Sequence, residues 1–236
     1  MSLRKFFLKN TFTYKIYLIY NLVIRHKSFL SRLSYSQWGE DLEIINYFKN
    51  KERGKYLDIG CFHPIMYSNT CLLYRKGWSG VNIDLNQTTI DLFNIARPDD
   101  LNLCRIIGSE EEKVKVYFDS LFSPVNTADE TFYSEHKKIF FKKKFTREVL
   151  SEKFHNIIEK NHINEIDFIN IDAEGMDYQV LQQINLNKIK VSLLAIETHY
   201  VSGGKTKDYS SIVEFLEING FSLLKRCGPT TLFNRI

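Results

Sequence analysis

The sequence predicts an α/β protein with a mostly parallel sheet, helices on both faces, and a β-hairpin at the C-terminal end. From residue 55 onward, runs that are apolar on both faces alternate with helical patterns. This alternation is typical of a parallel sheet covered on both sides by helices. Residues 221–236 differ, because two strand-like runs flank Gly228-Pro229, as in a hairpin. A length of 236 residues with 44% hydrophobic and 25% charged side chains fits one soluble globular domain.

The N-terminal segment, residues 1–34, is basic and aromatic and is predicted to be helical. Its apolar stretch, 16–24, is interrupted by Asn21 and is much shorter than the roughly 20 residues that span a bilayer. We therefore expect no transmembrane segment, and no signal peptide either, because no small-residue cleavage site follows. The helix could lie on the protein's own core, on the second copy of a homodimer, or on a membrane surface. The residues with helical spacing are Phe7, Tyr14, Tyr17, Leu18 and Leu22.

Residues 35–236 are predicted to form the main domain. It begins with a helix at 35–48, in which Ser36 is the expected N-cap and Leu42, Ile45 and Phe48 the buried stripe. The expected strands lie at 55–60, 79–85, 101–108, 166–173 and 191–199. The expected helices lie at 68–77, 87–96 and 176–184.

Residues 113–160 form an insertion in this domain. They separate two expected core strands by far more than the usual loop of 2–6 residues, and connections of this length are usually functional. The insertion contains a strand-like run, "VKVYFDS", and a lysine-rich stretch with helical character. The lysines would suit the phosphates of a nucleotide sugar, although a solvated face is the simpler interpretation. They are Lys137, Lys138, Lys142, Lys143 and Lys144.

Acidic residues stand at the ends of four expected strands: Asp58, Asp84, Asp172 and Glu197. The carboxyl ends of parallel strands meet at one edge of the sheet, where α/β proteins bind their ligands. Carboxylates gathered there repel one another unless a ligand or a cation lies between them. This edge is therefore the predicted site.

The turn after Asp58 indicates which cofactor the site would take. Gly60 permits a close backbone approach, and Asp84 stands where an acidic residue binds ribose hydroxyls. The later glycines of a pyrophosphate loop are absent, and His63-Pro64 occupies their place. A cofactor without phosphates is therefore favoured over NAD, and an NAD-dependent oxidoreductase is the alternative. The Ser68 or Thr70 hydroxyl could hold a carboxylate, or Ser68 could simply cap the next helix.

Together these motifs resemble the FkbM family of S-adenosylmethionine-dependent methyltransferases. The resemblance covers roughly residues 35–200, in "SQWGED", "LDIGCFHP", "YSNT", "KGWSGVNID", "IDFINIDAEGMDYQVL" and "IETH". It implies a Rossmann-like class I methyltransferase fold and O-methyl transfer onto sugars or other hydroxyl-bearing metabolites. It carries over Asp58, Gly60, Ser68, Asn69 and Asp84 as cofactor-site residues, with Ser109 as a weaker candidate near the adenine.

A sugar hydroxyl is a poor nucleophile at neutral pH, so the site needs a base or a cation. Asp172, Glu197 and His199 follow neighbouring strands and are the expected catalytic residues. The same three offer hard ligands for Mg²⁺ or Mn²⁺, a placement similar to that in metal-dependent sugar and catechol O-methyltransferases. Alternatively, Asp172 caps the next helix, and His199 is the base with no metal present. His63 could face the reaction centre, or it could be a structural residue of its turn.

The expected acceptor is a sugar, either a nucleotide sugar or a surface-glycan precursor. Nucleic acid is not expected, because the chain lacks a basic patch interleaved with aromatics and an N/D-P-P-Y/F motif. The four cysteines show no CxxC spacing and fit the reducing cytoplasm. We expect a cytoplasmic protein, with the N-terminal segment able to contact the inner face of the membrane. A further alternative is a non-catalytic module that docks on membranes.

Overall fold

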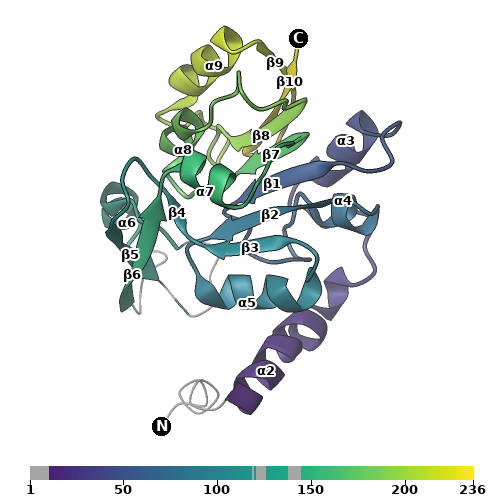
Figure 1. The fold of residues 1–236 in the computed structure, drawn as a ribbon, viewed down its shortest axis with the longest axis vertical. Helices are drawn as coiled ribbons and strands as arrows, with labels where there is room; N and C mark the ends of the chain where they lie inside the picture. The colour runs from purple at the N-terminus through teal and green to yellow at the C-terminus, as the bar shows by residue number, and fades with distance from the viewer. Residues whose placement is uncertain (1–10, 119, 121–125, 138–144) are drawn as a thin grey trace.

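The computed structural model describes residues 11–118, 120, 126–137 and 145–236. Its centre is a seven-stranded sheet with the strand order β3-β2-β1-β7-β8-β10-β9 (Figure 1). Neighbouring strands are parallel from β3 to β8, whereas β10 runs antiparallel to both β8 and β9. The α/β fold with a C-terminal hairpin is therefore confirmed. The strands are β1 (Lys55–Ile59), β2 (Ser79–Asp84), β3 (Leu101–Cys104), β7 (Phe168–Ile171), β8 (Leu193–Glu197), β9 (Phe221–Cys227) and β10 (Thr230–Arg235).

Helices cover both faces of this sheet because successive strand residues point to opposite sides. Leu57 and Ile169 pack on one side, in a core shared with α7 (Phe154–Lys160), α8 (Asp177–Gln183) and α9 (Tyr209–Ile218). Tyr56 and Phe168 point to the other side, in a core shared with α3 (Glu40–Tyr47) and α4 (Cys71–Arg75). Both faces of the central strands are buried, which explains their continuous apolar sequence.

The expected strand at 101–108 is divided in the structure. It breaks at Arg105 into β3 and a short strand β4 (Ile106–Ile107). The second piece leaves the main sheet and joins a small sheet with the order β4-β6-β5. The other members of this sheet are β5 (Lys113–Phe118) and β6 (Phe145–Glu152).

The predicted insertion is this small sheet together with α6 (Glu130–His136). Its last part, α7, belongs with the main core, where Phe154 and Ile157 are buried. Of the five lysines, only Lys137 lies among the described residues, where it is exposed.

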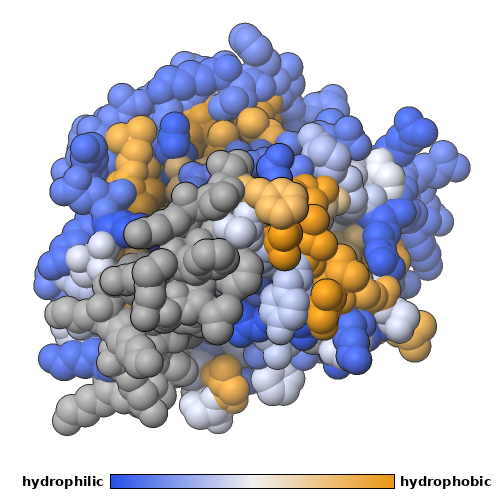
Figure 2. All heavy atoms as spheres, turned by 90° about the horizontal axis from the view of Figure 1, so that it is seen from below, coloured by the Kyte–Doolittle hydropathy of each residue, from blue (hydrophilic) through white to orange (hydrophobic). Residues whose placement is uncertain are grey.

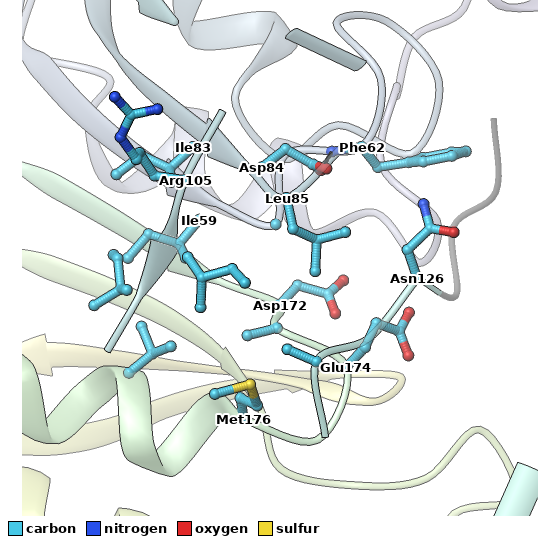
Figure 3. Close-up of a pocket in the computed structure, with 16 residues that line it drawn as sticks. Ile59, Phe62, Ile83, Asp84, Leu85, Arg105, Asn126, Asp172, Glu174 and Met176 are labelled. Carbon is cyan, nitrogen blue, oxygen red and sulfur yellow. Dashed lines mark hydrogen bonds between the residues drawn. The ribbon is translucent and has the colours of Figure 1, made fainter. Parts of the chain in front are cut away.

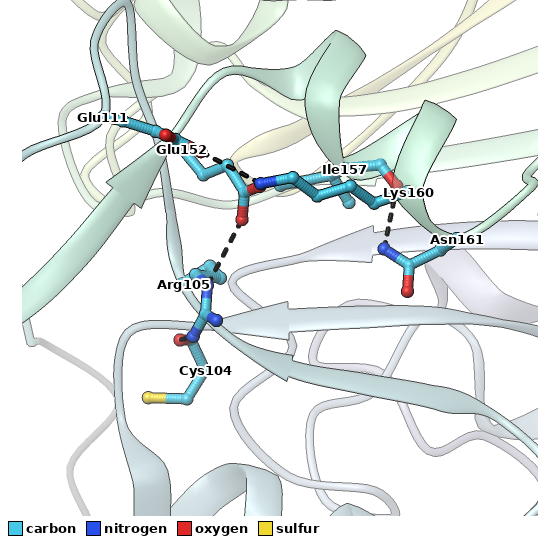
Figure 4. Close-up of polar contacts among 7 residues, drawn as sticks. All are labelled: Cys104, Arg105, Glu111, Glu152, Ile157, Lys160 and Asn161. Carbon is cyan, nitrogen blue, oxygen red and sulfur yellow. Dashed lines mark hydrogen bonds and ion pairs between the residues drawn. The ribbon is translucent and has the colours of Figure 1, made fainter.

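A cluster of charges joins the small sheet to the main domain (Figure 4). Glu152, at the end of β6, accepts a hydrogen bond of 3.3 Å from Arg105 Nε. It also pairs with Lys160 of α7, whose ammonium lies 3.0 Å from Glu111. Glu152 is buried, so its two cationic partners compensate a charge that would otherwise be costly to bury.

The helix expected at 35–48 begins later, at Glu40. Gly39 precedes it with φ +84°, a left-handed conformation that ends the extended chain and starts the helix. Ser36 is therefore not the N-cap; its hydroxyl donates to Asp41 Oδ1 at 2.7 Å. Of the predicted stripe, Phe48 is buried and Ile45 packs against the same core, whereas Leu42 is 45% exposed and Ile44 is buried in its place.

Residues 11–29 of the N-terminal segment are mostly helical. The helical parts are α2 (Thr11–Ile19), a π-helical stretch η1 (Tyr20–Arg25) and a 3₁₀ turn η2 (Lys27–Phe29). Leu18 and Leu22 pack against Met66 and Leu92, so one face of the helix lies on the protein's own core. Phe7 lies outside the described residues. Among the described helices, none combines the length and apolar character needed to cross a bilayer.

Candidate active site

The four strand-end carboxylates lie at one edge of the main sheet. Asp58 lies within β1, Asp84 ends β2, Asp172 directly follows β7 and Glu197 ends β8. Three adjoining pockets open at this edge, and Asp172 and Glu174 line all three of them. We name them by their distinctive residues: the Asp84 pocket, the Asp58 pocket and the Glu197 cavity.

The Asp84 pocket is mainly apolar. Figure 3 shows Asp172, Glu174 and Asn126 on one side of it and the apolar side chains of Ile59 and Met176 on the other. The Asp84 carboxylate accepts hydrogen bonds from the backbone N–H of Phe62 (3.0 Å) and Asn86 (2.7 Å). Burial nevertheless raises its pKa to about 7. Further apolar walls come from Ile83, Leu85, Ile106, Ile107 and Val180.

The Asp58 pocket contains two more of the predicted residues, held in one hydrogen-bonded chain. Asp58 accepts from Thr70 Oγ1 at 2.6 Å and from Asn170 Nδ2 at 2.9 Å. Asn69 donates to Asn170 Oδ1 at 2.8 Å. Because Asp58 is buried, its pKa is raised, although both hydrogen bonds favour the ionised form.

A buried arginine that the sequence analysis did not identify holds the loop carrying Ser68. The Arg97 guanidinium donates to Ser68 Oγ at 3.0 Å, to Thr70 Oγ1 at 2.8 Å and to Pro64 O at 2.5 Å. Arg97 is 1% exposed. The Ser68 hydroxyl thus has a structural partner, and Ser68 also lines the Asp58 pocket.

Gly60 is required by a contact within the protein. Its φ is +77°, and a Cβ there would lie 1.7 Å from the Asp172 carbonyl oxygen. The absence of a side chain therefore lets the turn after β7 pass directly over the end of β1. Gly60 also lines the Asp84 and Asp58 pockets.

Backbone strain gathers around the pockets. Phe62, Tyr67 and Glu174 have φ values of 48°, 55° and 47°, in the left-handed region that non-glycine residues rarely adopt. All three line at least one pocket. Such strain is maintained only where the surroundings enforce it, and it is concentrated at functional sites.

Three carboxylates approach one another in the Glu197 cavity. Asp172, Asp177 and Glu197 each offer an oxygen within 4.8 Å of the others. Desolvation by the surrounding protein, followed by repulsion from neighbouring carboxylates, raises the pKa of Asp172 to about 7 and of Glu197 to about 9. Asp177, whose pKa is raised to about 6, also accepts from Ala173 N–H at 2.8 Å. Such a group favours protons or a cation among its oxygens.

Asp177 completes this cluster, although the sequence analysis assigned it no role. It is the second aspartate of "DAEGMD", so the turn after β7 returns it beside Asp172. The predicted third member, His199, lies outside the cluster. Its Nδ1 is 2.8 Å from Thr198 Oγ1 and its ring meets Tyr209 edge-on. His199 is not among the residues that line the cavity.

His63 has a structural role in its turn. Its Nδ1 accepts the backbone N–H groups of Ile65 and Met66, both at 3.0 Å. Burial lowers its pKa to about 3, so the ring is neutral at physiological pH. Ser109 is exposed after β4 and does not line the Asp84 pocket, where Ile106 and Ile107 are found instead.

The Glu197 cavity has a volume of about 580 Å³. Its aromatic lining residues are Trp38, Tyr67, Phe132 and Tyr200. The small sheet's α6 forms one wall and the loop after β8 another, and Lys207 of this loop pairs with Asp129 at 3.6 Å. The carboxylate residues lining it are Glu40, Asp129, Glu135, Asp172, Glu174, Asp177, Glu197 and Asp208.

The strand order, the hairpin and the pockets at the carboxyl edge define a protein of the Rossmann-like methyltransferase class. A family model described as the methyltransferase FkbM domain matches residues 48–223. The chain belongs to this family, as its motifs indicated, and is a methyltransferase. Membership implies S-adenosylmethionine as the cofactor and favours methyl transfer over NAD-dependent oxidation. A search of curated proteins finds no match.

Proposed function

We propose that this protein is an S-adenosylmethionine-dependent O-methyltransferase acting on a hydroxyl of a sugar. The supporting observation is the Glu197 cavity, which adjoins the two smaller pockets through Asp172 and Glu174. Carboxylates accept hydrogen bonds from hydroxyl groups, and aromatic side chains offer flat apolar surfaces for a sugar ring. The cavity combines both kinds of side chain at the end of the cofactor pockets.

We assign the cofactor to the two smaller pockets. The apolar walls around Leu85 and Ile106 suit the adenine, and the Asp84 carboxylate suits the ribose diol. The Asp58 pocket, with Asn69 and Asn170, suits the methionine part. This placement directs the methyl group toward Asp172, between the cofactor and the acceptor.

Two of the clustered carboxylates suit the removal of the acceptor proton. The pKa of Asp172 is raised to about 7, where a carboxylate is partly ionised and is a stronger base than an ordinary carboxylate. The pKa of Glu197 is raised to about 9, so Glu197 accepts the proton only in its ionised form, which a cation bound among these oxygens would favour. We assign this role to them in preference to His199, because His199 does not line the cavity.

The same carboxylates suit a divalent cation. Asp172, Asp177 and Glu197 supply only oxygen ligands, which Mg²⁺ and Mn²⁺ prefer. When bound, such a cation would lower the pKa of the acceptor hydroxyl and orient it. Asp177 here takes the place first assigned to His199.

The acidic lining favours a sugar whose phosphate groups, if any, lie outside the Glu197 cavity. Eight carboxylate residues and one lysine, Lys207, line it, so a diphosphate inside would meet repulsion. A surface-glycan precursor and a nucleotide sugar both meet this requirement if only the sugar enters. The lysines of 138–144 lie outside the described residues.

The test is to incubate purified protein with S-adenosylmethionine and a panel of sugars, nucleotide sugars and glycan precursors. Mass spectrometry should find one acceptor heavier by a methyl group. Calorimetry should show heat on adding S-adenosylhomocysteine and none on adding NAD. Binding of NAD alone would contradict the proposal, as would methylation confined to amines. If turnover is unchanged after a chelator is added, the divalent cation has no part in the reaction, while the proposal of methyl transfer stands.

A further inference from the structure

The N-terminal helix has apolar side chains on two opposite faces. One face lies on the protein: Leu18, Asn21 and Leu22 are buried, and Tyr14 packs in the same cluster and donates to Asp91 at 2.6 Å. This face accounts for the position of α2 beside α5 (Gln87–Ala96). The other face needs a separate explanation.

The outer face is also apolar and is exposed. Six residues follow one another at helical spacing along α2 and η1, and each is at least 45% exposed. A solvated helix face normally carries polar side chains there. Figure 2, viewed from the end where α2 lies, shows apolar side chains gathered beside the residues drawn in grey. The six residues, here called the outer stripe, are Phe12, Ile16, Ile19, Tyr20, Val23 and Ile24.

The segment around the outer stripe has only positive charge. Residues 1–39 contain no aspartate or glutamate. The whole chain has a formal net charge of +4, so the remaining residues carry more acidic than basic side chains. Residues 1–39 therefore account for the net positive charge of the chain, and four of their seven basic residues lie in the part of the segment that the structure describes. The seven basic residues are Arg4, Lys5, Lys9, Lys15, Arg25, Lys27 and Arg32.

This charge favours a membrane over a second copy of the chain. Two copies joined through their outer stripes would bring two wholly basic segments together with no acidic residue to compensate them. An anionic lipid surface offers both an apolar layer and the opposite charge, and each nearby Lys or Arg strengthens the attraction. We propose that the outer stripe docks on an anionic membrane surface, with the helix lying in the plane of the interface.

The length of the helix agrees with this orientation. The described part of the helix, residues 11–25, is shorter than the roughly 20 residues that cross a bilayer and is long enough for an interfacial helix. Tyr20 has an amphipathic ring suited to the headgroup level. Through Met66 and the turn after β1, the same helix contacts the loop that carries Phe62 and Tyr67 of the Asp58 pocket. Docking would therefore hold the cofactor site near the membrane, whatever the acceptor.

The test is sedimentation of the full-length protein with lipid vesicles. One vesicle contains only zwitterionic phospholipid, and the other contains the same lipid mixed with an anionic phospholipid. We expect at least tenfold more protein to sediment with the anionic vesicles, and high salt to reduce the difference. The double variant Ile16→Ser/Val23→Ser should lose this binding while keeping its unfolding temperature and its affinity for S-adenosylhomocysteine.

A matched control removes exposed apolar side chains elsewhere. Ile218 and Leu224 are 77% and 44% exposed on α9 and β9, and Ile218→Ser/Leu224→Ser should sediment like the unmodified protein. Equal binding to both vesicles, or binding to neither, would overturn the proposal. So would a dimer in light scattering that the Ile16→Ser/Val23→Ser variant abolishes, since the outer stripe would then be a subunit interface.

Discussion

Asp84, the proposed ligand of the cofactor ribose, has a raised pKa. Its carboxylate is fixed by two backbone N–H groups, which leaves lone pairs for a ribose diol. Asp84→Asn should weaken S-adenosylhomocysteine binding by about 10- to 100-fold, since hydrogen bonds to a charged group contribute about 1.5–3 kcal/mol. Calorimetry measures the loss. Asp99→Asn, at an exposed position away from the pocket, is the control and should bind normally. Equal affinities in both variants would remove Asp84 from the cofactor site.

Glu197 and Glu174 provide a matched test of the proposed catalytic role of the carboxylate cluster. Both line the Glu197 cavity, but only Glu197 belongs to the group whose oxygens lie within 4.8 Å. Glu197→Gln should lower kcat by about 100-fold or more, the range for loss of a general base. Glu174→Gln should lower it less than about 10-fold. Initial rates with the identified acceptor give both values, and the reverse order would contradict the assignment.

Alanine substitutions at Gly60 and Gly220 distinguish the cost of a steric clash from the cost of backbone strain. Their φ values are +77° and +78°, but a Cβ at Gly60 would meet the Asp172 carbonyl at 1.7 Å, whereas Gly220 has nothing within 4 Å. Gly220→Ala should cost about 1–2 kcal/mol of unfolding free energy, the strain of a left-handed alanine. Gly60→Ala should cost at least about 2 kcal/mol more. Urea unfolding compares them, and equal costs would show that the turn after β7 can move away.

At the scale of elements, the strands of the main sheet were predictable because their signal is local. Strands buried on both faces show as short apolar runs, and β1, β2, β7 and β8 all coincide with such runs. The division between β3 and β4 was not predictable, since β4 pairs with β6 more than 40 residues away along the chain. The start of α3 was missed because the positive φ of Gly39, not the hydroxyl of Ser36, determines it.

The candidate site was predictable in part: the acidic residues at the strand ends were found from the sequence, whereas Asp177 and Arg97 were not. The acidic residues at the strand ends converge as the parallel topology requires. Asp177 is brought to them by the turn after β7, and Arg97 reaches Ser68 from the end of α5. Both positions depend on tertiary packing, for which the local sequence carries no periodic signal. The position of His199 beyond the cavity follows from the course of the chain after β8.

Glu152 tests whether the small sheet is fixed to the domain by charge. Glu152→Gln should lower the unfolding free energy by about 1–3 kcal/mol, because Arg105 loses its charged acceptor at a buried position. Glu148→Gln, on the same strand, is the control, as its contact with Lys113 is 3.7 Å long and exposed. That change should stay within about 0.5 kcal/mol. Equal effects in thermal unfolding would mean that the buried cluster contributes no more than a surface pair.

At the scale of the whole molecule, opposite charges are separated. Residues 1–39 contain seven basic and no acidic side chains, whereas eight carboxylate residues line the Glu197 cavity. The cavity therefore attracts cations, and the N-terminal segment attracts anionic surfaces. If the N-terminal segment holds the enzyme on an anionic membrane, the Glu197 cavity would still repel the phosphate groups of the lipids.

The uncompensated carboxylates make stability depend on pH. Glu197 and Asp172 have pKa values raised from 4.5 and 3.8 to about 9 and about 7. At a pH between its unfolded and its folded pKa, each of these carboxyl groups is protonated in the folded protein and ionised in the unfolded chain. The free energy of unfolding therefore falls as the pH rises toward the folded pKa values. The range from pH 7 to 9 is the informative one, because His63, whose pKa is lowered to about 3, is then neutral in both states.

We expect the unfolding temperature of the metal-free protein to fall between pH 7 and pH 9, with Glu197 contributing about 1–2 kcal/mol of the loss. Glu197→Gln should flatten this slope, since the variant has no proton to lose at that position. Adding Mn²⁺ should raise the unfolding temperature more at pH 9 than at pH 7, because the cation binds ionised carboxylates and competes with protons. Differential scanning calorimetry measures all three. A slope unchanged by Glu197→Gln would show that Glu197 is already ionised at pH 7. No response to Mn²⁺ at either pH would show that the three carboxylates hold protons and not a metal.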